Sequence, residues 1–311
     1  MNTLISCIEV FLTDGLMYSI LALGFYISFS ILDFPDLSVE GTVLLGAVGY
    51  SLLVCRGVNP WLGLIVSFIL GAAAGSVTGV LHVKFHIRPL LCGILVSTAL
   101  ISVNLVATVV GNGGSFTGEG ALSTISFSRT DETLLRSFPA NLIPDNVGGV
   151  NVRALVVFLA VSVLSKLIVD WYLSTKNGLL LRATGNNTQY VSMLAQDPGK
   201  SKITGLAIAN GFAAVAGALM ATSRANANQG MGIGTVVIGL ASVIIGLSVF
   251  GKIRFMKPTT MVIFGAIIYQ ACLSLATYIG IPSAYNKLIM AILFTVALVG
   301  SHAVKKGESK A

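Results

Sequence analysis

Nine long apolar runs, separated by short polar breaks, make up most of this chain. A helix needs about 20 apolar residues to cross the hydrocarbon core of a bilayer. On that criterion the pattern predicts membrane-spanning helices near residues 9–32, 38–55, 61–82, 90–110, 153–173, 202–222, 231–250, 258–279 and 286–302. We therefore expect an all-α polytopic membrane protein with about nine transmembrane helices, organised as one transmembrane domain over residues 1–311.

The composition agrees with this interpretation. Of the 311 residues 55% are hydrophobic and only 10% are charged, and the mean hydropathy is +0.88, which is too apolar for a soluble domain with a charged surface. The first run continues through Glu9 and Asp14 without the basic start or small-residue cleavage site of a signal peptide, so it is expected to remain as a span. The four cysteines lie in or beside apolar runs, without the spacing of a metal or redox motif.

The basic residues predict the orientation. A net charge of +7 is also found in proteins that bind nucleic acid, but Lys and Arg of membrane proteins collect in cytoplasmic loops. If the C-terminal tail is cytoplasmic, 13 of the 19 basic residues fall on that side. They are Lys84, Arg88, Lys166, Lys176, Arg182, Lys200, Lys202, Lys252, Arg254, Lys257, Lys305, Lys306 and Lys310. The pattern thus predicts a cytoplasmic C-terminus, an external loop over 111–152 and a cytoplasmic loop over 174–201. We therefore do not expect nucleic acid as a partner.

The two halves of the chain share short motifs. Lys84-Phe-His-Ile-Arg-Pro89 opens one predicted span and Lys252-Ile-Arg-Phe-Met-Lys-Pro258 opens another, four spans later and in the same orientation. Transporters are often built from such repeats. The matches favour a duplicated four-helix unit in parallel orientation, followed by a last helix. Small residues crowd the spans 63–79 and 205–221, and such faces let helix backbones approach closely.

Motifs for catalysis or for a cofactor are incomplete in this chain. Gly199-Lys-Ser201 matches the last three residues of a phosphate-binding loop, but position 194, where that loop needs glycine, is Leu. His82 and His86 have helical i, i+4 spacing without a third ligand nearby. A Ser/His/Asp set, paired carboxylates and a zinc signature are all lacking. We therefore expect no catalytic residue, no metal site and no cofactor in this chain.

Polar residues within the apolar runs are the candidates for a transport path. Pro35 and Gly41 interrupt the helix pattern around Asp33 to Gly41, and two interpretations stay open: a cytoplasmic turn with an Asp or Ser N-cap, or a broken helix that lines a path. The path candidates are Asp36, Ser38, Glu40, Asn104 and Asn210. Glu9, Asp14 and Gln270 are further polar positions, and any of these residues could instead hold helices together.

The loop 174–201 carries the most specific pattern. Leu179, Leu180 and Leu181 precede Arg182-Ala-Thr-Gly-Asn-Asn187, and a short helix is expected over 188–196, ended by Asp197-Pro-Gly199. Gly178-Leu-Leu-Leu-Arg-Ala-Thr-Gly-Asn-Asn187, followed by a glycine- and alanine-rich span from Lys202, resembles the permease subunits of ATP-binding-cassette importers of the branched-chain amino acid and ribose type. Asp36-Leu-Ser-Val-Glu-Gly41 is similar to a segment of the sugar branch, but Glu40 departs from it.

The resemblance implies a function and a set of partners. It implies a permease subunit that forms the path for a small solute, an amino acid in the branch to which this chain is most similar, in the inner membrane of a bacterial cell. The ATPase-coupling positions would be Gly178, Arg182, Ala183, Gly185, Asn186 and Asn187. The implied partners are a cytoplasmic ATP-binding subunit pair that carries the ATP, a second permease copy or paralogue, an extracytoplasmic substrate-binding lipoprotein, and membrane lipid.

A second function class remains open from the residues alone. The chain could be an ion-coupled secondary transporter or channel, whose halves move around Glu9, Asp14 or Glu40 without any ATPase. A membrane-embedded enzyme is a weaker third possibility, because the residues of a catalytic site are missing.

Overall fold

The computed structural model describes residues 2–113, 124–128, 131–144, 151–193, 195–251, 253, 255–282 and 285–308. In these ranges the helices are α1 (Asn2–Phe25), the π-helix η1 (Tyr26–Ile31), α2 (Val39–Cys55), α3 (Pro60–Val83), α4 (Pro89–Gly111), the 3₁₀ turn η2 (Ala140–Leu142), α5 (Val152–Ser174), α6 (Lys176–Asn186), α7 (Thr188–Met193), α8 (Pro198–Arg224), α9 (Thr235–Phe250), α10 (Pro258–Tyr278) and α11 (Asn286–Glu308). Two short strands, β1 (Thr124–Ser126) and β2 (Asn226–Asn228), pair antiparallel.

Each of the predicted spans corresponds to an apolar helix. Within the described residues, six helices are long and apolar enough to cross a membrane: Cys7–Ile31, Pro60–Val83, Pro89–Gly111, Val152–Ser174, Pro198–Arg224 and Pro258–Tyr278. Shorter apolar helices cover Val39–Cys55, Thr235–Phe250 and Leu288–Val299. The prediction of an all-α polytopic membrane protein is confirmed. The duplication of a four-helix unit stays a prediction.

Three details of the structure differ from the sequence-based prediction. The first span ends in a π-helix, in which Leu32 N donates to Ile27 O, five residues back. The run 231–250 becomes helical only at Thr235, because the residues before it form turns and the strand β2. The predicted loop 111–152 contributes the strand β1, and its residues 114–123, 129–130 and 145–150 lie outside the described residues.

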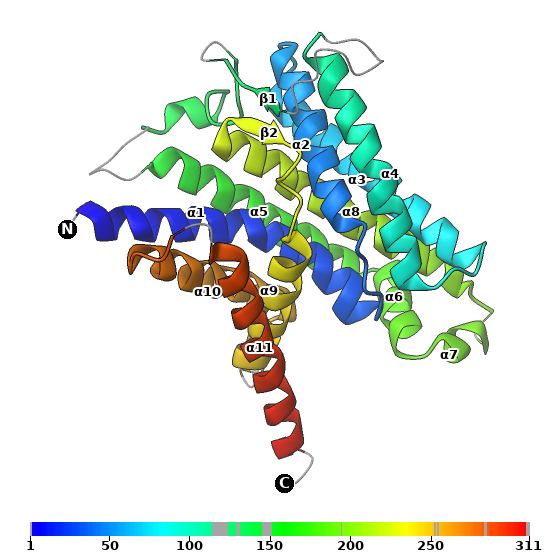
Figure 1. The fold of residues 1–311 in the computed structure, drawn as a ribbon. Coiled ribbons are helices and arrows are strands. Elements are labelled where there is room, and N and C mark those ends of the chain that lie inside the picture. Colours follow the sequence, from blue (N-terminus) through cyan, green and yellow to red (C-terminus); the bar gives the residue numbers. More distant parts are fainter. Residues whose placement is uncertain are drawn as a thin grey trace.

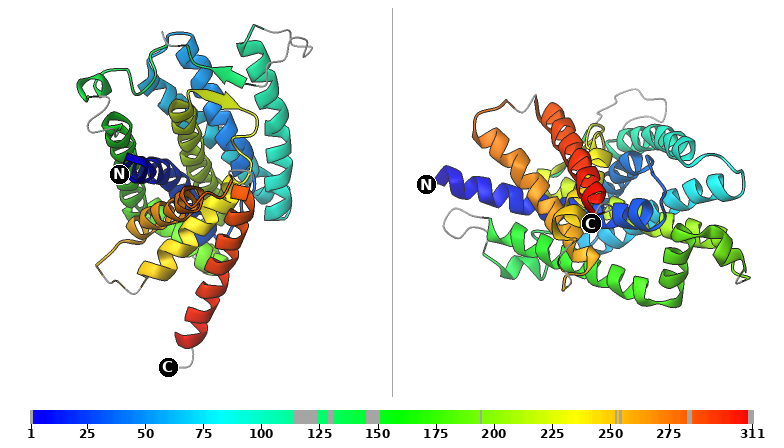
Figure 2. Two further views of the ribbon diagram at one scale, coloured as in Figure 1. Left: turned by 60° about the vertical axis from the view of Figure 1, so that its left-hand side comes forward. Right: turned by 90° about the horizontal axis from the view of Figure 1, so that it is seen from below.

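Helix α8 lies at the centre of the bundle. It packs along α3 and α2 and also touches α1, while α1 packs along α10 and α10 along α9 (Figures 1 and 2). Small residues make these contacts close, as the sequence predicted. A Cβ at Gly217 would overlap the carbonyl oxygen of Val43, and one at Gly75 would overlap that of Leu206. The backbones of α2, α3 and α8 therefore touch with almost no side chain between them.

The outward faces of α4, α5 and α11 are apolar. Exposed side chains on these helices include Leu95, Ile101, Leu164, Leu167 and Ile292. A face of this kind is stable against lipid or against another apolar protein surface. The described part of the chain is therefore apolar both in its core and on these helix faces, as expected for a membrane protein.

The bundle has two distinct ends. Helices α6 and α7 mark one end, here called the α6 end, and the β1–β2 ribbon marks the other, the ribbon end (Figure 1). His82 in the last turn of α3 contacts Lys202 of α8, and Arg182 of α6 lines a pocket with Pro258 of α10. Of the basic residues that the sequence grouped on one side, Arg182, Lys200 and Lys202 thus lie at the α6 end, whereas Lys252, Arg254 and Lys310 lie outside the described residues.

The close packing of α3 on α8 can be tested. Gly75→Val should destabilise the protein, because its Cβ would overlap the Leu206 carbonyl oxygen. We expect a loss of about 1–3 kcal/mol, measured as a lower melting temperature of the detergent-purified protein. Ala73→Val places the same valine side chain at an exposed position of the same helix and should melt like the wild type. Equal melting of both variants would contradict the packing described here.

Candidate functional site

Helix α6 is formed by the stretch that the sequence analysis treated as a structured loop. Thr175 is its N-cap, and its hydroxyl oxygen accepts a hydrogen bond from Gly178 N at 3.3 Å. Leu181 points into the protein and is fully buried, whereas Leu179 is exposed. Asn187 ends the helix, and its side-chain oxygen accepts from Tyr190 N at 3.1 Å. The second helix, α7, ends at Met193, earlier than predicted.

The predicted coupling glycines are the points where α6 touches the bundle. A Cβ at Gly185 would overlap the carbonyl oxygen of Ile31, the last residue of η1. A Cβ at Gly178 would overlap the carbonyl oxygen of Tyr172, near the end of α5. Only glycine allows backbones to approach this closely. Helix α6 is therefore fixed directly to the end of the first span.

Arg182 lies beside the same π-helix. It is exposed and lines a pocket of about 310 Å³ together with Tyr26, Ser30, Ile31, Asn186 and Pro258. Tyr26, Ser30 and Ile31 belong to η1, and Pro258 begins α10. π-Helices are uncommon and often occur at functional sites. Of the remaining predicted coupling residues, Ala183 is half-buried, and Asn186 and Asn187 are exposed at the end of α6.

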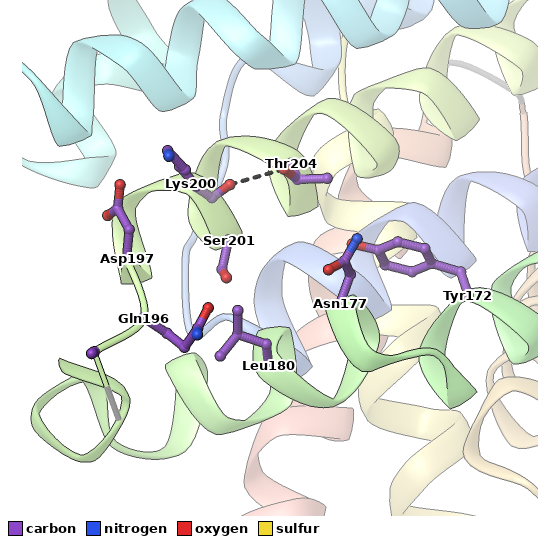
Figure 3. A pocket seen from close by; sticks show the side chains of 9 residues that line it. Tyr172, Asn177, Leu180, Gln196, Asp197, Lys200, Ser201 and Thr204 are labelled. Carbon is purple, nitrogen blue, oxygen red and sulfur yellow. Dashed lines mark hydrogen bonds between the residues drawn. The ribbon is translucent and has the colours of Figure 1, made fainter. Parts of the chain in front are cut away.

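A second and larger pocket opens on the other side of α6. Its volume is about 400 Å³, and Tyr172, Asn177, Leu180, Ala195, Gln196, Asp197, Lys200, Ser201 and Thr204 line it (Figure 3). In Figure 3 the side chains of α6 and of the α8 start face each other across this space. Asp197 is the N-cap of α8, and its carboxylate accepts from Gly199 N at 2.8 Å. The α6 end thus presents a polar hollow between α6 and α8.

Polar contacts fasten the other helix ends around α6. Asp170 of α5 accepts hydrogen bonds from Lys166 Nζ at 3.0 Å, Lys257 Nζ at 3.2 Å and Thr259 Oγ1 at 2.6 Å. His82 of α3 lies 2.9 Å from the Ile87 carbonyl oxygen through Nδ1. Its Nε2 lies 3.3 Å from Lys202 Nζ, so both ring nitrogens of His82 are engaged within the protein.

The path candidates Asp36, Ser38, Glu40, Asn104 and Asn210 lie together, and we call them the midpoint cluster. Asp36 is 1% exposed, and its Oδ1 accepts from Ser38 N at 2.8 Å and from Ser38 Oγ at 2.6 Å. Its Oδ2 accepts from Asn210 Nδ2 of α8 at 2.7 Å. The carboxylate therefore joins the irregular segment before α2 to the middle of α8.

Glu40 and Asn104 extend the cluster to two more helices. Glu40 Oε1 accepts the N–H of Gly234, the N-cap residue of α9, at 2.9 Å. Asn104 Nδ2 of α4 donates to Gly41 O at 3.0 Å. The structure thus brings all five path candidates to the start of α2. The chain is not helical between η1 and α2, and Ser38 occupies the N-cap position of α2 without a side-chain capping bond. The role of these residues along a path stays a prediction.

Several participating groups were not anticipated from the sequence. Tyr26 and Ser30 belong to a π-helix, for which the apolar run gives no signal. The backbone N–H of Gly234 and the Lys202–His82 contact depend on which helices become neighbours in space. The Gly230, Gly232 and Gly234 series was the available hint, because repeated glycines in an apolar run indicate irregular backbone.

Comparison with known proteins identifies relatives along almost the whole chain. The family model described as "Branched-chain amino acid transport system / permease component" matches residues 7–298. A tyrosine transport system permease protein of Clostridioides difficile is 36% identical over 96% of this chain and 94% of its own length. An uncharacterised protein of Rickettsia prowazekii is 30% identical over 96% and 97%. A probable branched-chain amino acid transport permease protein LivH of Methanocaldococcus jannaschii is 25% identical over 68% and 66%. No solved structure matches.

The Asp36–Asn210 bond should contribute to stability. Asn210→Leu keeps the side-chain size but removes the donor to a buried carboxylate. A buried polar group that loses its partner costs about 1–3 kcal/mol, and more when it is charged, so the purified variant should melt at a lower temperature. Asn177→Leu, at an exposed position of α6, is the matched control. If Asn210→Leu melted like the wild type, the bond would not hold α8 to the segment before α2.

Proposed function

Because the chain belongs to the family of permease components of branched-chain amino acid transport systems, we propose that it forms the transmembrane path of an importer driven by a separate ATPase. It is a multi-pass membrane protein and a transport subunit rather than an enzyme. The ATP-binding-cassette mechanism, the substrate and the partners are parts of this proposal.

The contact of α6 with η1 is the observation that carries the proposal. An ATPase that pushes on α6 would act on Ile31 through Gly185, with no compressible side chain between the two backbones. From Ile31 the chain continues through only a few residues to Asp36, which is bonded to Asn210 in the middle of α8. Movement of α6 would therefore reach the centre of the bundle along a short covalent connection.

The proposed orientation places the α6 end in the cytoplasm. The described Lys and Arg residues of that end support this side by the positive-inside rule. The C-terminal end of α11 lies toward the same side of the molecule as α7 in Figure 1. The ribbon end would then face the outside and meet a substrate-binding lipoprotein. We expect the membrane to be the inner membrane of a bacterial cell.

The proposed ATPase contact is the surface of α6 and α7 around the 400 Å³ pocket. Asn177 of α6 and Ser201 of α8 both line this hollow, so a protruding side chain of an ATPase would find hydrogen-bond partners on both helices (Figure 3). Importers of this class need two ATPase subunits, and we propose a second permease copy, or a paralogue, beside this chain. This chain itself would hold no ATP.

The proposed substrate is an amino acid. Its support is the 36% identity to a protein named a tyrosine transport system permease and the family description. Asp36, Ser38, Glu40, Asn104 and Asn210 are the proposed residues along the path, because they lie halfway through an otherwise apolar bundle. Polar side chains at this depth are costly and usually serve a substrate path or a helix contact.

The coupling role of Arg182 predicts a loss of stimulated ATP hydrolysis. In proteoliposomes that contain the permease, its ATPase and its binding protein, Arg182→Glu should lower substrate-stimulated hydrolysis about tenfold, which corresponds to ~1.4 kcal/mol of coupling. The reversed charge would repel the group of the ATPase that binds the arginine. Lys176→Glu makes the same charge change in the first turn of α6 and should have a much smaller effect. Stimulation of Arg182→Glu at the wild-type level would exclude this role.

A substitution at Gly185 tests whether α6 transmits movement to η1, separately from whether the ATPase binds. Gly185→Val should push α6 away from the Ile31 carbonyl oxygen without altering the outer surface of α6. We expect the ATPase to co-purify with this variant in normal amount, while ATP-driven uptake falls about tenfold or more, an effect of at least ~1.4 kcal/mol on the coupled step. Uptake equal to that of the wild type would show that the α6–η1 contact does not transmit movement.

A further inference from the structure

Two helices begin close together in the interior of the bundle. Glu40, in the first turn of α2, accepts a hydrogen bond from the N-cap residue of α9. A Cβ at Gly232 would overlap the Glu40 carbonyl oxygen, so the chain before α9 lies directly on the start of α2. Helix α2 runs from this point toward the ribbon end, and α9 runs away from it (Figure 1). Neither helix crosses the whole bundle.

This meeting point lies near mid-depth. Ser38 and Asp36, just before α2, bond to Asn210, which is the thirteenth residue of the 27-residue helix α8. At 1.5 Å per residue, Asn210 is about 18 Å along a helix of about 40 Å. The start of α2 is therefore close to halfway between the α6 end and the ribbon end.

The chain reaches this depth from the ribbon end without forming a helix. After β2, residues 229–234 descend as turns beside α2 (Figure 1). Ile233 is 60% exposed and Gly230 is also exposed. Backbone of this kind is not tolerated against lipid, because its N–H and C=O groups need partners, and it occurs at membrane depth only inside protein or beside water. This face of the bundle therefore does not face hydrocarbon.

A buried acceptor oxygen without a partner occurs at the same place. Asn104 is fully buried, and its amide nitrogen must face the Gly41 carbonyl, since only the nitrogen donates. Its Oδ1 is buried and has no partner among the described residues. Glu40 carries a second carboxylate oxygen, and none of the ion pairs found in the described part of the chain involves Glu40. Buried acceptors without donors are rare and call for an explanation.

We propose that Glu40 and Asn104 bind the ammonium group of the transported amino acid at mid-depth, and that residues 229–234 form the wet wall of the path beside them. The proposal rests on the proposed function and names which part of the substrate this chain recognises. A carboxylate and an amide oxygen both accept, so they fit a cationic donor and repel an anionic one. In the conformation described Asn104 Oδ1 is closed off, so α4 must move from α2 when the substrate passes.

The binding role is tested by the amount of substrate carried per ATP. Glu40→Gln keeps an oxygen for the Gly234 N–H but removes the charge. In proteoliposomes with the ATPase and binding protein we expect the ratio of amino acid taken up to ATP hydrolysed to fall about tenfold, an effect of ~1.4 kcal/mol. Asn104→Leu should lower the ratio as well. Glu132→Gln, an exposed carboxylate at the ribbon end, should keep the wild-type ratio.

The outcomes separate this inference from the proposed function. Wild-type uptake that needs ATP, with an unchanged ratio in Glu40→Gln, would overturn the inference alone. Absence of ATP-driven uptake by the wild-type complex would overturn the proposed function. Uptake that follows a sodium gradient and still needs Glu40 would assign the carboxylate to a transported ion, and this result would also overturn the ammonium site.

The wet wall is tested without transport. In a background without the four cysteines, Ile233→Cys in membranes should react with a hydrophilic, charged thiol reagent, and the substrate amino acid should slow the reaction. Leu164→Cys, 56% exposed on the apolar face of α5, is the matched control and should stay unreactive in lipid. If both cysteines reacted equally slowly, residues 229–234 would not line water and the inference would fail.

Discussion

The need to satisfy backbone hydrogen bonds in a hydrocarbon environment governs this structure. A helix meets this need within itself, but the chain leaves the helical conformation twice inside the bundle, at residues 32–38 and at 229–234. At both breaks an acidic side chain accepts a hydrogen bond from a backbone N–H group. Asp36 accepts the Ser38 N–H, and Glu40 accepts the Gly234 N–H. These two carboxylates therefore allow α2 and α9 to begin in the interior, and they line the path that we propose for the substrate.

Close backbone packing complements these breaks. Glycines let α2, α3 and α8 touch without intervening side chains, so the three helices form one closely packed unit. The same device recurs at the α6 end, where Gly185 rests on Ile31. A displacement of α6 would be absorbed in residues 32–38, next to Asp36 and Asn210, rather than lost within the helices.

Much of the fold was predictable because membrane insertion depends on local composition. Each predicted span corresponds to an apolar helix, and the pattern around Arg182 marked the segment that forms α6, although a helix was predicted only over 188–196. The π-helix at Tyr26 and the late start of α9 were missed, since both lie within continuous apolar runs and depend on neighbouring helices. The five midpoint residues were selected individually as polar positions in spans. Their assembly around one helix start required the tertiary structure, as did the direction of Arg182 toward η1.

The central claim is that this chain transports only as part of an ATP-driven assembly, in which the ATPase acts on α6. The most direct measurement is uptake of radiolabelled tyrosine and branched-chain amino acids by proteoliposomes, in which the permease is reconstituted alone or with its ATPase and binding protein. The account predicts uptake by the complete assembly in the presence of ATP, and none by the permease alone under a sodium or proton gradient. Gradient-driven uptake by the permease alone would contradict the account and identify a secondary transporter instead.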